Sequence, residues 1–450
     1  MLLRAGSLPQ ANGGVIVVDA DELFRDLDAW RAMKRSVNSG WIEVQRTGSS
    51  NAGSLRPEPI RTAFKVVAIG SESHYDSMVA YDADFTAVFK IKVQVEDTIP
   101  RGKATLHDMG RALLRISRRA GLQAPNAQAL ARLLEHSARL AGRNDRLVPA
   151  FSDLLDILQE ADRIASARAR GGQSIGREDV QDALSRRRRR HDLGERQAQE
   201  LLDDGIVLLE CTGSRVGVVN ALVVYDDGVA SFCRPMRVSA AVGLGRRGIV
   251  DIEREAEFSG NTHHKGLAIA SGLLRERYAQ DKPLCLTGTV CFEQSYSRVN
   301  GDSASMAEVL ALLSALGDLP LDQGWGVTGS INQKGDVQAI GDVNAKIEGQ
   351  FAACLARGLT GRQGVVIPEA NVRDLMLEPE VGEAVSKGRF HVAAVRTVDD
   401  ALELLTGVPA GSRGSPLEPF PAASANGRVD ARLRAYADAA REFDRSERAD

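Results

Sequence analysis

The stretch VNGDSASMAEVL at residues 299–310 places small and polar residues directly before an apolar run with helical spacing. Its two serines suit two different tasks. Ser305 stands three residues before Glu308, and S-x-x-E is the capping-box pattern that satisfies free N–H groups at a helix start. Ser303 lies just before the predicted helix, among residues small enough for a substrate backbone to approach. N–H groups of the first helical turn can hold an oxyanion there, so Ser303 is a candidate nucleophile.

A serine hydroxyl is a poor nucleophile until a base removes its proton. Histidine is the usual base, and the chain carries the pair His263–His264. Adjacent side chains project in different directions, so we expect this pair to line a loop or pocket and not to share a metal. Lysine is the other candidate base, provided that burial or a positive potential keeps its amine neutral near pH 7.

Lys346 lies in the sequence IGDVNAKIEGQFAACLARGL, residues 340–359. With Asn344 as the predicted N-cap, Lys346 falls in the first helical turn, where the macrodipole disfavours a cation. It also borders an apolar face at helical spacing, formed by Ile347, Phe351, Cys354 and Leu355. Both effects predict a lowered pKa for Lys346. Taken alone, the position favours a surface lysine whose stem covers the helix start.

Composition narrows the class of protein. The 450 residues allow several domains, and the net charge of -3 gives the whole molecule no strong attraction to nucleic acid or acidic lipid. The five cysteines form no C-x-x-C pair, which argues against a disulfide framework and against a zinc site. The N-terminus lacks the apolar run of a secretory signal, and nowhere are about 18 apolar residues consecutive. We therefore expect a cytoplasmic protein with no membrane span and no metal or other cofactor.

The chain divides into four parts that differ in hydrophobic periodicity and composition. The N-terminal part reads as an α/β layer with buried strands at 13–24 and 63–70 and a third strand at 89–96. Residues 103–187 show helical spacing, and residues 205–405 alternate strand-like and helix-like segments with glycine-rich connections.

The C-terminal tail is the fourth part. The segment at 407–427 is rich in Pro, Gly, Ala and Ser and is interpreted as a flexible linker. The last segment, at 428–443, predicts one helix whose apolar stripe is too thin for stability on its own.

Two features of the helical region carry separate predictions. Ser174 is the expected N-cap of the helix that follows the glycines at 171–172. The run Arg186–Arg190 has the composition of a nucleic-acid patch. We interpret it instead as a solvated helix end leading into a linker, since arginine there complements the macrodipole.

The sequences GDSAS (301–305) and VNAK (343–346) together resemble the Ser-Lys dyad domain of Lon proteases, with Ser303 and Lys346 separated by 43 positions. The sequence at 292–349 is similar to the LonB and LonC-type branch of that family, and the resemblance covers about 200–408 densely.

This resemblance implies a nucleophile at Ser303 and a general base at Lys346. It also implies that Thr328 lies beside the lysine and orients its amine. Where relatives often read IGGVNEK, this chain carries Asp342 and Ala345.

Lon enzymes carry an ATPase module before the protease, and the sequence from Ala5 to Phe24 resembles the second half of that module. Asp19, Asp21 and Glu22 end the first predicted strand with the carboxylates that a magnesium site requires. However, G-x-x-x-x-G-K-[ST] occurs nowhere in the chain, so no residues are assigned to nucleotide binding, and the acidic tip is interpreted as a relic or a structural strand end.

The expected fold is therefore α/β and multidomain. It comprises a degenerate AAA+-like module (1–101), a helical domain (102–190), a Lon-type proteolytic domain (191–409), and a linker with a tail helix (410–450).

The resemblance predicts an ATP-independent serine endopeptidase that degrades unfolded proteins and peptides inside a homo-oligomeric ring, most simply a hexamer. Alternatives remain at this point: an ATP-dependent Lon protease whose P-loop lies upstream of this chain, a non-catalytic ring scaffold or holdase, another Ser-Lys hydrolase such as an amidase, or a nucleic-acid-binding regulator. The last conflicts with the net charge and with the lack of a base-reading motif.

Overall fold

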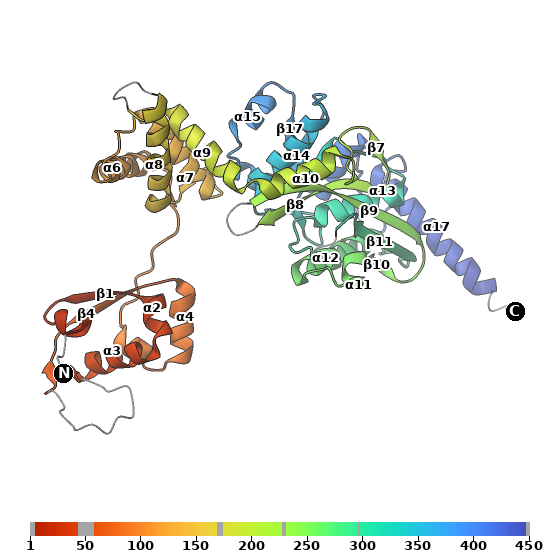
Figure 1. Cartoon of the computed structure of the whole chain (residues 1–450). Coiled ribbons are helices and arrows are strands. Elements are labelled where there is room, and N and C mark those ends of the chain that lie inside the picture. Colours follow the sequence, from red (N-terminus) through yellow and green to blue (C-terminus); the bar gives the residue numbers. More distant parts are fainter. Residues whose placement is uncertain (1–4, 44–57, 169–173, 227–230, 296–297, 447–450) are drawn as a thin grey trace. The chain divides into compact units, whose positions relative to one another are not determined.

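The computed structural model describes residues 5–43, 58–168, 174–226, 231–295 and 298–446. These residues form two compact units, divided between Glu96 and Asp97 (Figure 1). The elements of the first unit are α1 (Ser7–Gln10), β1 (Val15–Asp19), α2 (Ala20–Arg25), α3 (Leu27–Ser39), β2 (Trp41–Ile42), β3 (Ile60–Arg61), β4 (Lys65–Ile69), α4 (Glu72–Tyr81) and α5 (Phe85–Val88).

The first unit is built on a two-stranded parallel sheet in which Val17 of β1 lies opposite Val67 of β4. Burial alternates along both strands. Val66 packs against the aromatic cluster around Trp30 and Phe85, while the faces with Val17 and Val67 are exposed. The prediction of buried strands is therefore wrong for this unit, because within the described residues helices cover one face of the sheet.

The predicted third strand at 89–96 is also wrong. These residues have no regular structure, and Ile91, Val93 and Val95 are exposed. A strand needs a neighbour that supplies its backbone hydrogen bonds, and no strand of the described part of the chain pairs with this segment.

The second unit begins with a helical part in which four helices enclose a core of leucine, isoleucine and alanine side chains. Its elements are β5 (Ile99–Pro100), α6 (Lys103–Arg119), α7 (Ala127–Leu140), β6 (Arg146–Leu147), α8 (Phe151–Arg168) and α9 (Arg177–His191). The predicted N-cap at Ser174 is wrong. Gly176 is the N-cap of α9, and the Asp179 carboxylate accepts a hydrogen bond from the Gly176 N–H at 2.9 Å.

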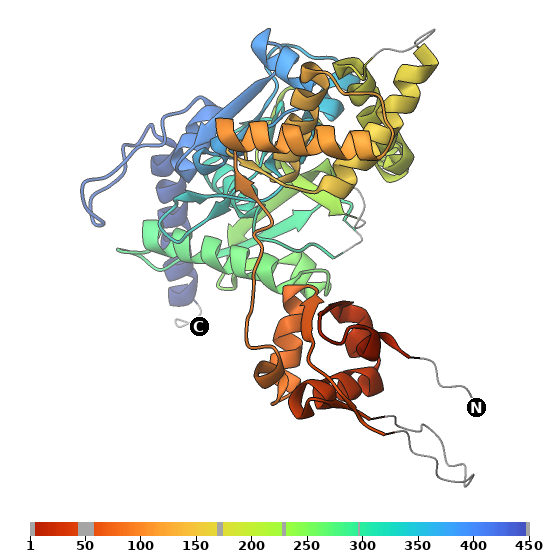
Figure 2. The ribbon, with the colours of Figure 1, turned by 90° about the vertical axis from the view of Figure 1, so that its left-hand side faces the viewer.

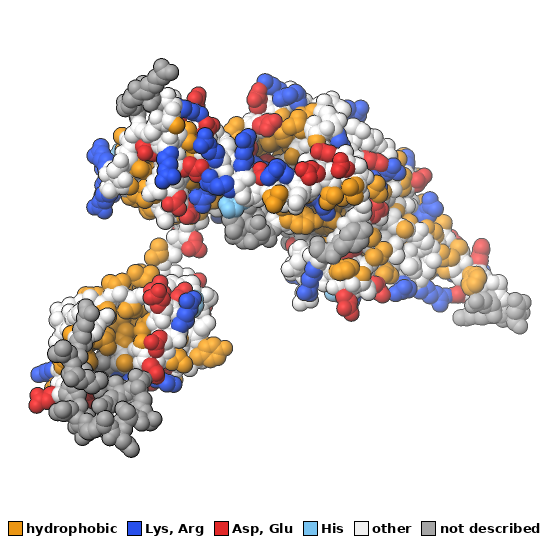
Figure 3. Space-filling model, in the orientation of Figure 1, with side chains coloured by type: hydrophobic (Ala, Val, Ile, Leu, Met, Phe, Trp, Pro, Cys, Tyr) orange, Lys and Arg blue, Asp and Glu red, His pale blue; other side chains and the backbone are white. Residues whose placement is uncertain are grey.

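The arginine run lies in the last turns of α9, and all five of its residues are exposed, as predicted. Figure 3 shows Lys and Arg side chains gathered over this helical part. Arg190 forms two 2.8 Å hydrogen bonds with Glu160. The expected linker is absent from this position, because α10 (Leu193–Asp203) begins after a single intervening residue.

A mixed seven-stranded sheet organises the rest of the second unit, in the order β10-β11-β9-β8-β13-β16-β17. Only β9 runs antiparallel to both of its neighbours, β8 and β11, and the other neighbouring pairs are parallel. The strands are β8 (Val218–Asp226), β9 (Ser231–Leu244), β10 (Gly248–Asp251), β11 (Leu286–Phe292), β13 (Trp325–Val327), β16 (Gly364–Pro368) and β17 (His391–Val395). The short pairs β7 (Ser214–Arg215) with β12 (Leu321–Asp322), and β14 (Ser330–Ile331) with β15 (Val337–Gln338), complete the strands of this part.

Helices cover both faces of this sheet, because alternate strand residues point to opposite sides. Val219 and Ala221 of β8 belong to the core beneath α13, whereas Leu222 belongs to the core beneath α14. The helices are α11 (Ile252–Glu255), α12 (Asn261–Tyr278), α13 (Ser305–Gly317), α14 (Val343–Arg357), η1 (Glu369–Asp374), α15 (Pro379–Ser386), α16 (Val398–Thr406) and α17 (Ala425–Ser446).

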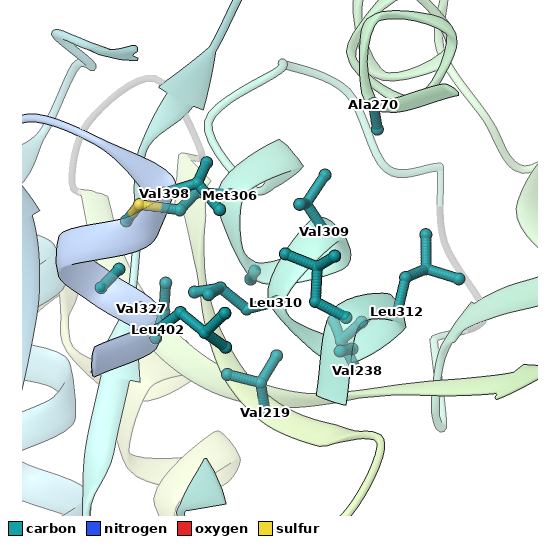
Figure 4. Close-up of a cluster of buried hydrophobic side chains, with 14 of the residues drawn as sticks. Val219, Val238, Ala270, Met306, Val309, Leu310, Leu312, Val327, Val398 and Leu402 are labelled. Atoms are coloured by element: carbon teal, nitrogen blue, oxygen red, sulfur yellow. The ribbon is translucent and has the colours of Figure 1, made fainter. Parts of the chain in front are cut away.

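Helix α13 is buried on nearly every side, which explains its continuous apolar sequence. Figure 4 shows Met306, Val309 and Leu310 of this helix among Val219 and Val238 of the sheet. Truncating a fully buried leucine such as Leu310 to alanine typically costs about 2–5 kcal/mol.

The C-terminal tail forms the predicted helix but differs from the predicted flexible linker. Ala410 and Ser424 are buried, and α17 places Ala425, Val429 and Leu433 in the core formed with α13. The thin apolar stripe is therefore stabilised by tertiary packing. The last turns of α17 extend beyond the sheet, as Figures 1 and 2 show. Across the described ranges of the chain, no helix is long and apolar enough to cross a membrane.

Candidate active site

The candidate site lies at the carboxyl end of β13, which pairs in parallel with β8 on one side and β16 on the other. Helix α13 covers one face of the sheet at this point and α14 covers the other. Carboxyl ends of parallel strands are where α/β sheets commonly bind ligands. The first residue after β13 is Thr328, whose side chain is fully buried. The topology thus brings together residues from three separate segments of the chain.

Ser303 occupies a turn directly before α13, and Gly301 in that turn has a φ of 94°, which favours glycine. The Ser303 carbonyl accepts hydrogen bonds from the Gly329 N–H (2.8 Å) and the Thr328 hydroxyl (3.2 Å). The Met306 N–H donates to the Gly329 carbonyl at 3.1 Å. These contacts fix the serine backbone to the segment that follows β13.

The capping box predicted for Ser305 is wrong. Ser305 is the first helical residue, the N-cap is Ala304, and the Ser305 hydroxyl accepts a hydrogen bond from the Ile331 N–H at 3.2 Å. Glu308 bonds to His263 instead of to the helix start. The segment after β13 supplies a competing backbone donor, so the hydroxyl ties β14 to α13.

The predicted oxyanion donors are only partly free. The N–H groups of Ser305 and Met306 donate to the carbonyls of Asp302 and Gly329, respectively. These two N–H groups of the first turn therefore already have acceptors in this structure.

Lys346 lies in α14, and its side chain is almost entirely buried. The predicted N-cap at Asn344 is wrong: α14 begins at Val343, and the Asn344 side chain bonds to the backbone of Asp374 and Met376. Asp342 precedes the helix in the left-handed conformation, with a φ of 57°. Aspartate is one of the residues that tolerate that conformation, which accounts for Asp342 at this position.

The three predicted site residues meet. The Lys346 Nζ atom lies 2.8 Å from the Ser303 Oγ atom and 3.1 Å from the Thr328 Oγ1 atom. Because the Thr328 hydroxyl donates to the Ser303 carbonyl, its oxygen is left to accept a hydrogen bond from the amine. A neutral amine held this way directs its lone pair toward the Ser303 hydroxyl.

Electrostatics at the site favour a neutral lysine. Burial lowers the pKa of Lys346, and the nearby charges of Asp342 and Asp302 offset that effect only in part. Asp302 also accepts a hydrogen bond from the Ser330 hydroxyl at 2.9 Å. The Cys233 thiol is itself buried, which raises its pKa to about 12, so this neighbour stays uncharged at neutral pH. The arrangement can remove a proton from a hydroxyl and return it to a leaving group.

The acidic tip of β1 lies in the first unit. The Asp19 carboxylate accepts hydrogen bonds from the N–H groups of Asp21 (2.8 Å) and Glu22 (3.1 Å), so it caps α2. The Asp21 carboxylate lies 2.8 Å from the His74 ring. No group of three or more His, Cys, Asp or Glu side chains in the described ranges has the geometry to hold a metal ion.

The histidine pair was predicted to line a loop or a pocket, and the loop is wrong, since both residues belong to α12. His263 is buried and bonds to Glu308 at 2.8 Å. Sequence reasoning missed this contact, because it assigned Glu308 to a cap. The signal that could have revealed it was a glutamate inside an otherwise apolar helix, which requires a buried partner.

Comparison with known proteins agrees with this architecture. Three family models match: the LonB-like AAA domain over residues 1–96, the AAA+ ATPase LID domain of archaeal LonB over residues 125–190, and the C-terminal proteolytic domain of Lon protease over residues 297–407. The fold and these matches define a peptidase built from an AAA-like module and a Lon-type proteolytic domain. They confirm the predicted fold class.

Proteins with similar sequences are named as Lon proteases or Lon protease homologs. A "Putative Lon protease homolog" of Escherichia coli strain K12 is 35% identical over 415 residues, which cover 90% of this chain and 68% of that protein. A homolog of the same name from Haemophilus influenzae is 29% identical, with 90% and 67% covered. The archaeal Lon protease of Methanothermobacter thermautotrophicus is 25% identical, with 89% and 60% covered. The chain belongs to the Lon protease family, as the dyad-like motif predicted, and spans about two thirds of its bacterial relatives.

Proposed function

We propose that this chain is a serine endopeptidase in which Ser303 is the nucleophile and Lys346 is the general base. The observation that carries the proposal is the 2.8 Å distance between the Lys346 amine and the Ser303 hydroxyl, at a buried lysine whose pKa is lowered by burial. A serine becomes reactive when a neutral base lies within hydrogen-bond reach.

The proposed reaction uses this geometry. The Lys346 amine takes the proton of the Ser303 hydroxyl as its oxygen attacks the peptide carbonyl, and the resulting ammonium gives that proton to the departing amine. The acyl group is then bonded to Ser303. The neutral lysine removes a proton from the attacking water, and the ammonium returns a proton to the Ser303 oxygen as the carboxylic product leaves. Thr328 keeps the amine oriented through both steps, since it accepts one of the amine's N–H bonds.

We further propose that cleavage by this chain needs no nucleotide. This chain carries no G-x-x-x-x-G-K-[ST], so within it no such loop binds phosphate, although Asp19 ends β1 and Asp21 and Glu22 follow in α2. Without hydrolysis no force opens a folded substrate. At about 5–15 kcal/mol of stability the open fraction of a folded domain is very small, so the substrates are unfolded proteins and peptides.

The remaining parts of the proposal concern assembly and location. Free diffusion of such a site would endanger other proteins, so we propose a closed homo-oligomer, a hexamer in the simplest case, which light scattering would detect. The five cysteines are free thiols, which suits the reducing cytoplasm.

The deciding experiment measures cleavage of casein and of a fluorogenic peptide, with and without ATP-magnesium, by the natural chain and by Ser303→Ala. We expect nucleotide-independent cleavage that Ser303→Ala abolishes while the far-UV circular dichroism is unchanged. Ser386→Ala is the matched control, because Ser386 is exposed at the end of α15 and only bonds within its own helix. Full turnover by Ser303→Ala would disprove the dyad. A severalfold acceleration by ATP would disprove nucleotide independence, and an inactive natural chain would favour a scaffold or holdase.

A further inference from the structure

Four ionisable side chains form a buried cluster that the proposed mechanism does not use. They come from four elements: Asp251 at the end of β10, Glu253 in α11, His263 in α12 and Glu308 in α13. His263 and Glu308 are each 1% exposed, Glu253 is 5% exposed and Asp251 is 6% exposed. Burying charged groups is costly, so a cluster of this kind needs an explanation.

The imidazole of His263 lies at the centre of the cluster. Its Nε2 atom is 2.8 Å from Glu308 Oε1, and its Nδ1 atom is 3.0 Å from Ser259 Oγ and 3.7 Å from Asp251 Oδ2. Both ring nitrogens therefore face oxygen atoms. The Ser259 hydroxyl also lies 3.3 Å from the Gly260 carbonyl, and when it donates there its oxygen accepts from Nδ1–H, so a doubly protonated imidazolium fits both contacts. On the remaining side, the ring packs edge-on against Phe292, with ring centroids 5.5 Å apart.

The charges of the cluster favour that cationic form. Burial by itself lowers the pKa of His263, but the hydrogen bond and charge of Glu308, together with Asp251 and Glu253, outweigh it and raise the pKa. Burial also raises the pKa of Glu253, whose Oε1 atom accepts the Phe292 N–H at 2.6 Å. One oxygen each of Asp251, Glu253 and Glu308 has no hydrogen-bond partner, so the imidazolium is the counter-charge of an acid-rich cluster.

The cluster is joined directly to the turn that carries Ser303. One helical turn after His263, Gly266 packs so closely on this turn that an added Cβ would lie 3.3 Å from Ser305 Cβ and 3.4 Å from Asp302 Cβ. On the other helix, Glu308 stands in the first turn of α13, five residues after Ser303. The His263–Glu308 contact therefore links α12 to the first turn of α13, on either side of the turn that carries Ser303.

The segments that precede α12 and the Ser303 turn are also hydrogen-bonded to each other. The Gly260 N–H, just before α12, donates to the Val299 carbonyl at 2.8 Å, and the Val299 N–H donates to the Phe258 carbonyl at 2.8 Å. Val299 leads into the turn at Gly301–Ser303, so a shift of α12 would move this turn.

We propose that His263, held as a cation by Glu308 and Asp251, is a positioning residue that keeps the Ser303 hydroxyl within hydrogen-bond distance of Lys346. Loss of the imidazole proton therefore inactivates the site. The inference rests on the proposed serine peptidase function. It implies two limbs in the pH profile of kcat: a rise as Lys346 loses its proton and a fall as His263 loses its own.

The test compares the pH profiles of kcat and KM for the natural chain, Glu308→Gln, His263→Gln and the double variant His263→Gln/Glu308→Gln. Glu308→Gln keeps the shape but removes the main group that raises the His263 pKa, so the alkaline fall should move to lower pH. The two variants without His263 should lose the alkaline fall. Their kcat should drop on the order of 10- to 100-fold with little change in KM, as expected of a displaced nucleophile.

The controls separate positioning from folding. His264→Gln changes the next residue of the same helix, which faces a different direction, and it should leave both limbs in place. Since His263→Gln leaves carboxylates without a counter-charge and risks misfolding, the double variant provides a neutral pair of similar shape. An alkaline limb that stays unchanged in the well-folded double variant and in Glu308→Gln overturns the proposal.

A second readout does not depend on activity. Hydrogen–deuterium exchange of a peptide covering residues 298–306 should be faster in the double variant than in the natural chain and in His264→Gln. Equal exchange would contradict the claim that the His263–Glu308 contact holds the turn that carries Ser303. If the natural chain has no Ser303-dependent activity, the proposed function fails, and the exchange result still decides whether His263 holds this turn.

Discussion

Strands β1 and β13 both run parallel to a neighbour and both lead directly into polar residues, yet only the end of β13 resembles a reaction site. β13 lies between β8 and β16, with helices on both faces of the sheet, and the hydroxyl and amine at its end are buried. β1 pairs with β4 and shows exposed valines on one face, and its Asp19 serves as a helix cap.

The difference shows that residue type at a strand end does not make a site. Burial on both faces takes water away from Lys346 and lowers its pKa, whereas the carboxylates after β1 remain in contact with solvent or bond to nearby groups. The comparison predicts that activity depends on the end of β13 and is insensitive to the end of β1.

Replacing Lys346 by arginine should have the largest effect. A guanidinium keeps its proton in proteins, so the base is lost and kcat should fall by about 10²- to 10⁴-fold. Peptide cleavage at pH 8 measures this, with the exposed Lys334→Arg as the matched control. The double variant Asp21→Asn/Glu22→Gln at the other strand end should keep the natural rate. A comparable loss of kcat in the double variant would show that activity also depends on the end of β1 and would contradict the comparison.

Replacing Thr328 by valine should have the next largest effect. Valine keeps the shape but removes the oxygen that accepts the Lys346 amine, so the lone pair loses its direction and kcat should fall about 10- to 100-fold. KM should change little, because Thr328 holds a protein group in the proposed mechanism. Steady-state kinetics separate the two constants. A change confined to KM would assign Thr328 to substrate binding instead.

Replacing Asp342 by asparagine should shift the pH profile. The Asp342 charge raises the pKa of Lys346 and opposes the effect of burial, so its removal should lower that pKa further. Activity rises with pH as the lysine deprotonates, and the rising limb should therefore move to lower pH, by less than about one unit. Asparagine also tolerates the left-handed backbone at this position. A shift to higher pH would contradict the electrostatic account.

The same pKa difference determines how stability depends on pH. The pKa of Lys346 in the folded protein lies below its value of 10.5 in the unfolded chain. As pH rises through the folded pKa, the folded state loses its proton before the unfolded state does, so the free energy of unfolding should rise until about pH 10.5.

Replacing Asp19 by alanine should have the smallest effect. The cap of α2 is lost, which costs the first unit about 1 kcal/mol of stability, while peptide cleavage should stay at the natural rate. Urea unfolding of the full chain, followed by the fluorescence of Trp30 and Trp41 in a Trp325→Phe background, measures the cost. A clear loss of cleavage would show that the two strand ends are coupled.

The sequence by itself determined the elements and the chemistry of the second unit. Helical spacing and β-branched runs marked α12, α13 and α14 and most strands of the large sheet, because these segments bury the sides that their patterns indicate. The resemblance of GDSAS and VNAK to Lon proteases named Ser303, Thr328 and Lys346, which the structure brings together. Their catalytic roles stay predictions until the kinetics are measured.

Only the tertiary structure decided which partners the polar residues take. Ser305, Asn344 and Ser174 all fitted local cap patterns, yet the Ser305 and Asn344 side chains bond to backbone groups distant in the sequence, and Gly176 caps the helix expected for Ser174. A local pattern competes with every donor and acceptor that the fold brings near, and the sequence does not reveal those competitors. For the same reason, pairing and packing decided that residues 89–96 form no strand, that α17 is stable, and that His263 lies buried against Glu308.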